Sequence, residues 1–296
     1  MKVIKRIALI ALTILLIATS AYFPCRKFFK FCQKSRIYLN LKSQIEEESK
    51  NAPGHISFVI KDLTFPSLEL SCLAREKFPA ASLIKVPILA SVLQAVETGR
   101  LSLEQQVTIT QADLTGGSGK IKTLKLPINV TLQELLEFMI SHSDNTASNK
   151  IIDLLGFDYL NESFKKAGLK DTVLKRRMMD FSQRPNGKEN YTSARDIVFL
   201  LNKIYAKKLI NKEFSQIALS LLKKQRIKDR IPRYLPKNII VAHKTGLEHG
   251  IVHDAGIVFA PQGDYIICVL MKKSHNYKAA KKFIAQVSLL TYNFYE

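Results

Sequence analysis

The sequence predicts an α/β (α+β) fold in which terminal helices flank an antiparallel sheet and a mostly helical subdomain is inserted. Strand-like segments gather at the two ends of the chain, and helical periodicity dominates its middle. The sheet must therefore be assembled from distant segments, with one long helical insertion between them. A length of 296 residues suits one large domain or two closely packed subdomains.

Each element follows from hydrophobic periodicity and turn residues. A first helix is expected over residues 37–50, and helical periodicity later holds from Ser82 to about Leu222. The expected strands and the closing amphipathic helix are His55–Asp62, Leu68–Leu73, 238–244, 251–260, 264–272 and Tyr277–Phe294.

This order of elements sets the predicted domain boundaries. Residues 37–296 should form one domain, with a sheet part at 37–81 and 231–296 and a helical part at 82–230. A functional site would lie in the cleft between the two parts, where the motifs described below converge.

The N-terminus has the pattern of an export signal. Basic residues precede the apolar run Ile7–Ala18, which has the length of a secretory signal. Residues 1–24 are therefore predicted to be a signal peptide or a membrane anchor, and whether they are cleaved stays open. Residues 25–36 are basic and are predicted to be a juxtamembrane linker. We expect an exported, extracytoplasmic or periplasmic domain, with residues 7–24 in contact with the membrane.

The net charge of +20 is partly local, because residues 1–36 hold eight Lys or Arg and no acid. A basic surface suits an anionic wall polymer or anionic lipid. No nucleic-acid-binding module is recognisable, and export would exclude that role.

Four cysteines are too few for a disulfide scaffold, and pairing of Cys25 with Cys32 stays open. We expect a monomer.

A hydroxyl and an amine stand three residues apart at the start of an apolar helix, as Ser82 and Lys85. Residues i and i+3 share one helix face, with Cβ atoms about 5–6 Å apart. A helix that opens near Ala81 would also place the hydroxyl at its positive end. A serine is a weak nucleophile until a base takes its proton, and a buried lysine with a lowered pKa is such a base.

This pattern is common by itself, and two further motifs make it specific. Ser143-Asp144-Asn145 follows an apolar helical run, and Lys244-Thr245-Gly246 follows a strand-like segment. The patterns S-x-x-K, S-D-N and K-T-G together are typical of class A β-lactamases and penicillin-binding proteins. They occur here in that order, 61 and 101 residues apart.

The segments Arg75–Ser82, Thr131–Asn149 and Arg230–Pro236 extend the resemblance beyond the tripeptides. The chain is similar to the class A β-lactamase-like serine hydrolases over roughly residues 37–296. The resemblance implies the β-lactamase/transpeptidase-like fold and acyl transfer to a serine. It implies a β-lactam or a peptidoglycan stem peptide as substrate.

The resemblance also implies a role for each site residue. The four catalytic residues would be the nucleophile, its base, the group that protonates the departing amine, and a neighbouring cation: Ser82, Lys85, Ser143 and Lys244. The four substrate-binding residues would be Asn145 for the acyl-amide, Thr245 for the carboxylate, Gly246 for close approach and Leu247 for the oxyanion. The backbone N–H groups of Ser82 and Leu247 would bind the oxyanion.

No metal and no cofactor are predicted. His249 and His253 are spaced like a metal pair, but no further ligand set is apparent around them. The loop Thr115–Gly119 is glycine-rich and is expected to be a flexible edge of the cleft.

The chain departs from the family pattern in residues 175–192, where the E-x-x-L-N segment of class A β-lactamases is absent. The glutamate of that segment activates the water that hydrolyses the acyl-enzyme. Ser182 or Gln183 falls near its expected place, and the carboxylates nearby are Asp180 and Glu189. We expect Glu189 to belong to the start of the following helix.

Three functions are consistent with these residues. The first is a class A β-lactamase-like hydrolase that opens the β-lactam ring through a Ser82 acyl-enzyme, with slow deacylation. The second is a D-alanyl-D-alanine peptidase or penicillin-binding protein that acts on peptidoglycan. The third is a non-catalytic exported domain that binds the cell wall, which the complete set of acylation residues disfavours.

Overall fold

The computed structural model describes residue 29 and residues 31–296. The predicted signal or anchor segment, residues 1–24, lies outside the described residues. In the described part of the chain, no helix combines the length and the apolar character needed to cross a bilayer.

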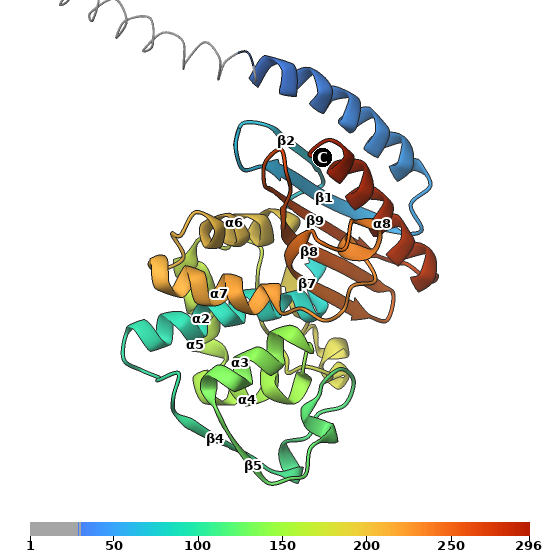
Figure 1. Ribbon diagram of the computed structural model, residues 1–296. Coiled ribbons are helices and arrows are strands. Elements are labelled where there is room, and N and C mark those ends of the chain that lie inside the picture. The colour runs from blue at the N-terminus through green and yellow to red at the C-terminus, as the bar shows by residue number, and fades with distance from the viewer. Residues whose placement is uncertain (1–28, 30) are drawn as a thin grey trace, which may run out of the picture.

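An antiparallel sheet of five strands is the centre of the fold, in the spatial order β2-β1-β9-β8-β7 (Figure 1). Its strands are β1 (His55–Asp62), β2 (Glu69–Cys72), β7 (Ile240–Glu248), β8 (Ile251–Phe259) and β9 (Tyr265–Lys272). Strand β1, from the beginning of the chain, pairs with β9, from its end. The predicted fold class, with a sheet built from distant segments, is confirmed.

The segment between β2 and β7 is mostly helical. Its helices are α2 (Lys85–Glu97), α3 (Leu132–Ser141), α4 (Asn145–Leu155), α5 (Phe157–Ala167), α6 (Ala194–Tyr205) and α7 (Lys212–Lys223). Short pieces complete it: β3 (Phe78–Pro79), η1 (Ala81–Ile84), β4 (Gln106–Ile109), η2 (Gln111–Asp113), η3 (Ile121–Thr123), β5 (Ile128–Thr131), η4 (Phe181–Asn186), β6 (Tyr191–Thr192) and η5 (Ile231–Tyr234).

Two hydrophobic cores lie on opposite faces of the sheet. In β9, Ile266 and Cys268 face the core shared with the middle helices, whereas Ile267 and Val269 face the core shared with α8 (Tyr277–Asn293). This alternation is the two-residue period of a strand. Because both faces are covered, β9 reads as a continuous apolar run in the sequence.

A helix over residues 31–50 packs beside α8 on the outer face of the sheet (Figure 1). This helix begins before residue 37, where its start was predicted, and so includes residues of the predicted linker. Lys34 explains the difference, because its Nζ lies 2.6 Å from a carboxylate oxygen of the fully buried Asp62. The same Nζ lies 4.4 Å from the ring centre of Tyr295, whose hydroxyl donates to Asp62.

Asp62 is expected to be the strongest single tie between this helix and the sheet. Its carboxylate also accepts from the backbone N–H groups of Thr64 and Phe65. Asp62→Ala should lower the free energy of unfolding in urea by about 3–5 kcal/mol, because it leaves a buried cation and buried donors unpaired.

The matched control is Glu46→Ala, which removes the exposed partner of Lys42 on the same helix. It should change stability by less than about 1 kcal/mol. Equal losses in the two variants would contradict the assigned importance of the buried pair.

Candidate active site

Ser82 lies in the 3₁₀ turn η1, and Lys85 is the first residue of α2. The prediction that a helix opens near Ala81 is confirmed, with a tighter first turn than an α-helix has. Ala81 has a φ of 43°, which is unusual for a residue with a side chain. The turn is fixed from the preceding residue, because Ala80 N donates to Asn190 O at 2.7 Å.

The S-D-N turn between α3 and α4 brings its side chains to Lys85. The Lys85 ammonium nitrogen donates to Ser143 O at 2.7 Å and to Asn145 Oδ1 at 2.8 Å. It also lies 3.3 Å from Ser143 Oγ. Ser82 Oγ makes no hydrogen bond among the described residues. The hydroxyl therefore lies one turn from a buried amine and is free to meet a ligand.

Lys244 reaches the same hydroxyl from the opposite wall. It lies inside β7, which continues to Glu248 instead of ending at residue 244 as predicted. Its Nζ donates to Ser143 Oγ at 2.9 Å and to Thr245 O at 2.9 Å. The structure therefore places the Ser143 hydroxyl between two lysines that are 159 residues apart in the sequence.

Burial lowers the pKa of both lysines. The pKa of Lys85 falls well below its ordinary value, first because of desolvation and then because of the nearby charge of Lys244, with Asp144 acting in the opposite direction. Desolvation lowers the pKa of Lys244 to about 7, while Asp254 raises it and Arg230 lowers it. A lysine that is neutral near pH 7 can accept a proton from a hydroxyl.

Thr245, Gly246 and Leu247 lie along β7 beside these groups. Gly246 packs inward, because a Cβ there would lie 3.2 Å from the Cβ of His253 and 3.4 Å from that of Ala81. Glycine thus lets β7 approach the turn that carries Ser82 without displacing these neighbours, a packing reason that we did not expect. Leu247 is about half exposed, at 49%.

Asp144 is a supporting residue that the sequence did not single out. Its carboxylate caps α4 by accepting from Ala147 N, and it also accepts from Lys120 N and Ile121 N at 2.7–2.8 Å. A Cβ on Gly119 would lie 2.5 Å from this carboxylate, so only glycine fits.

The glycine-rich loop is therefore docked against the S-D-N turn, and the expected flexible edge is not what the structure shows. Asn145 N donates to Ser118 O at 3.0 Å, and Asn145 Nδ2 donates to Gly116 O at 2.9 Å. These contacts join segments about 29 residues apart, which local sequence patterns do not reveal.

The loop over residues 175–192 holds Glu189 in an ion network. Glu189 accepts from Arg176 Nε at 2.9 Å and from Arg184 Nε at 2.6 Å. Both arginines also contact Glu248, the last residue of β7. The expectation that Glu189 begins the next helix is wrong, because α6 starts at Ala194 and the arginines hold Glu189 away from it.

Another part of this loop is hydrogen-bonded to α4, the helix that follows the S-D-N turn. Asn149, one helical turn after Asn145, accepts from Met178 N at 2.7 Å and donates to Met178 O at 3.2 Å. Gln183 lies instead in η4, and the nearby Asp180 carboxylate accepts from Ser182 Oγ at 2.6 Å. Met178 thus occupies the loop position next to the site, and its side chain is buried.

Both ring nitrogens of His253 are hydrogen-bonded to backbone groups, so His253 cannot form a metal-binding pair with His249. Its Nδ1 accepts from Met271 N at 3.0 Å, so its Nε2 carries the proton and donates to Pro79 O at 2.9 Å. Desolvation lowers the pKa of His253 to about 4. Both ring nitrogens are occupied, and the imidazole is held neutral.

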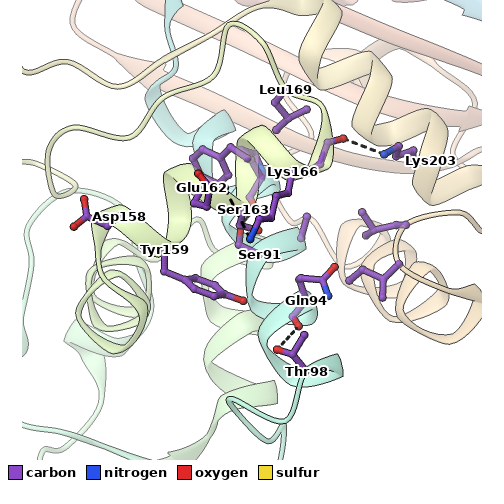
Figure 2. Close-up of a pocket in the computed structure, with 16 residues that line it drawn as sticks. Ser91, Gln94, Thr98, Asp158, Tyr159, Glu162, Ser163, Lys166, Leu169 and Lys203 are labelled. Atoms are coloured by element: carbon purple, nitrogen blue, oxygen red, sulfur yellow. Dashed lines mark hydrogen bonds and ion pairs between the residues drawn. The ribbon is translucent and has the colours of Figure 1, made fainter.

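A separate cavity of about 670 Å³ lies between α2 and α5 (Figure 2). Ser91 and Gln94 of α2 and Tyr159 and Ser163 of α5 are among its lining residues. None of the eight predicted site residues lines it. It is therefore not the place where the three motifs meet.

Comparison with known proteins agrees with this geometry. Residues 40–295 match the model of the β-lactamase enzyme family. The β-lactamase VEB-1 of Pseudomonas aeruginosa is 27% identical, over 100% of this chain and 99% of that protein.

Two solved structures are similar throughout. A β-lactamase from Sphaerobacter thermophilus is 28% identical with a TM-score of 0.79, covering 85% of this chain and 96% of that one. A mutant of PBP-A, described as an acyl-enzyme complex with penicillin G, is 31% identical with a TM-score of 0.78, covering 86% and 96%.

The lowered pKa of Lys244 predicts a pH-dependent stability. Between its folded value of about 7 and its ordinary value of 10.5, Lys244 is neutral in the folded state and protonated in the unfolded state. The unfolded state then binds more protons, so stability rises with pH in this window, by about 1.4 kcal/mol per pH unit for one proton.

Urea unfolding from pH 7 to 10 should therefore show a shallower rise in Lys244→Met than in the wild type. Lys165→Met, at an exposed lysine of α5, should leave the slope unchanged. Parallel profiles for the wild type and Lys244→Met would show that the pKa is not lowered.

Proposed function

Because the chain belongs to the β-lactamase enzyme family and is a β-lactamase-like serine hydrolase, we propose that it opens β-lactam rings through an acyl-enzyme on Ser82. The observation that carries this proposal is the hydrogen-bonded series Lys85–Ser143–Lys244, which begins one turn from Ser82. It can take a proton from the nucleophile and return one to the leaving group.

In the first step the Ser82 Oγ attacks the lactam carbonyl carbon, and neutral Lys85 takes the hydroxyl proton. Two N–H bonds of a neutral Lys85 amine are used by Ser143 O and Asn145 Oδ1, so its lone pair remains to accept that proton. The backbone N–H groups of Ser82 and Leu247 would bind the oxyanion, each donor being worth roughly 10²–10³ in rate.

In the second step the C–N bond of the lactam breaks and the nitrogen takes a proton from Ser143. Lys85 then returns a proton to Ser143, which restores the series. Lys244 stabilises the negative charge that develops on the Ser143 oxygen and, with Thr245, attracts the substrate carboxylate. Asn145 keeps one N–H of its amide for the acyl-amide carbonyl, since the other donates to Gly116 O.

We propose that the ester formed is hydrolysed slowly. Deacylation needs a general base that takes a proton from the attacking water, and such a base typically raises the rate about 10²–10⁴-fold. The two arginines hold Glu189, and the loop position bonded to Asn149 is the apolar Met178. The loop therefore offers no free carboxylate at that position.

The same observation supports a second candidate, a D-alanyl-D-alanine peptidase or penicillin-binding protein acting on peptidoglycan. Acylation by a wall peptide would use the same residues, and the likeness to PBP-A is consistent with it. The family assignment favours an enzyme over a non-catalytic wall-binding domain. We also propose export, on the strength of the N-terminal sequence alone.

Acylation can be measured by intact-protein mass spectrometry. The wild type should gain the mass of penicillin G at Ser82, and Ser82→Ala should not. Lys85→Ala should acylate slower by about 10²–10⁴-fold, the size of general-base assistance. Lys165→Ala is the matched control and should acylate as the wild type does. An unmodified wild type after prolonged exposure to several β-lactams would refute the proposed reaction.

Slow deacylation predicts a burst followed by a slow steady state with nitrocefin. Met178→Glu should raise the steady-state rate by about tenfold or more, because a buried carboxylate with a raised pKa next to the S-D-N turn can act as the base. Gln183→Glu is the matched control and should not accelerate turnover, since Gln183 lies in η4. Rapid multiple turnover by the wild type would contradict the proposal.

A further inference from the structure

The N-terminal helix has an outer face that the described part of the protein leaves uncovered. Phe29 and Leu39 are 70% and 69% exposed, and Cys32 and Arg36 are exposed between them. Spacings of three and four residues place these four side chains on one face. Ile37, 47% exposed, lies at its edge.

The opposite face of the same helix carries the contacts with the domain. Tyr38, Leu41 and Ile45 are buried in the outer core, and Lys34 pairs with Asp62. The helix is thus apolar on two sides, and the described part of the protein covers only one of them (Figure 1). An uncovered apolar stripe of this kind indicates an interaction surface.

Charge identifies the partner. Residues 26–36 contain five Lys or Arg and no acid, whereas residues 46–48 are three consecutive glutamates. The sequence therefore changes from basic to acidic between residues 26 and 48. An anionic lipid surface attracts the first part and repels the second, whereas a second copy docked through the same exposed residues 29–39 would bring two basic segments together.

Membrane insertion of residues 7–18, as the sequence predicts, would place a bilayer close by. The apolar run Ile7–Ala18 ends 11 residues before Phe29. Even a fully extended chain spans at most about 3.6 Å per residue, so the first turns of the helix stay within about 40 Å of the run's end. Exposed aromatic and aliphatic side chains beside basic residues are typical of helices that lie in the membrane interface.

We propose that Phe29, Cys32, Arg36 and Leu39 dock on an anionic lipid surface. The pairing of Lys34 with Asp62 then holds the hydrolase domain in one orientation to that surface. The first turns of the helix lie in the interface and its acidic end stands away from it. The proposal rests on membrane insertion of residues 7–18 and is independent of the chemistry at Ser82.

The test uses an environment-sensitive fluorophore on Cys32 of the full chain, in a background with Cys25→Ser and Cys72→Ser. Cys268 is fully buried and should not react. The protein is reconstituted in vesicles of phosphatidylcholine alone or with phosphatidylglycerol. With phosphatidylglycerol we expect a blue shift of emission and quenching by brominated acyl chains.

Ser43 provides the matched control position. It lies 11 residues after Cys32, about three helical turns, on the same side but in the acidic half of the helix. Label at S43C, in a Cys32→Ser background, should stay in water. Phe29→Asp with Leu39→Asp should weaken docking by about tenfold for each side chain and remove the blue shift at Cys32.

Three results would overturn the proposal. They are no shift at Cys32 with anionic lipid, equal quenching at the two positions, and a lipid-independent shift that grows with protein concentration, which would indicate a second copy. Penicillin adduct formation at Ser82, measured on the same samples, reports the fold of each variant. It also separates failure of docking from failure of the proposed activity.

Discussion

The burial of two lysines around one hydroxyl is the constraint on which the rest of the site depends. Removing an ammonium group from water is expensive unless its hydrogen bonds are replaced or it gives up its proton. Lys85 and Lys244 are both fully buried and share Ser143. Their surroundings supply acceptors and opposing charge: Ser143 O, Asn145 Oδ1 and Thr245 O accept directly, while Asp144 and Asp254 act from a distance. The same burial that weakens the fold lowers the pKa values that the chemistry requires.

The loop over residues 175–192 has a different physical role from a loop that carries a base. Its two arginines bind Glu189 and Glu248, and Phe181 lies 4.7–5.0 Å from the two guanidinium carbons. Its Asn190 O fixes Ala80 close to Ser82, and its arginines fix the end of β7 beside Leu247. The two segments whose N–H groups would form the oxyanion hole are therefore both tied to this loop. A loop of this kind preserves acylation geometry even where it supplies no general base.

Sequence reasoning predicted what short-range patterns encode. Strand periodicity located β1 and β9, and the spacing of Ser82, Ser143 and Lys244 indicated residues that the fold does bring together around Lys85. It could not predict features that depend on packing between distant segments. Gly119 is required by the Asp144 carboxylate, Gly246 by His253 and Ala81, and Met178 is placed by Asn149. The start of the first helix was also misplaced. In the sequence Lys34 looks like part of a basic linker, and its pairing with Asp62 is visible only in the structure.

Three of the seven non-glycine residues with positive φ in the described part of the chain lie where these segments meet. Ala81, Ser143 and Met179 have φ values of 43°, 54° and 66°, and none is glycine. Each such residue costs of order 1–3 kcal/mol and persists only where its surroundings fix it. Here Asn190 holds the residue before Ala81, Lys85 holds the carbonyl of Ser143, and Asn149 holds the residue before Met179. Buried lysines and strained turns thus occur at the same place, and the two large apolar cores offset both. The active site is the part of the molecule that the remainder of the fold must stabilise.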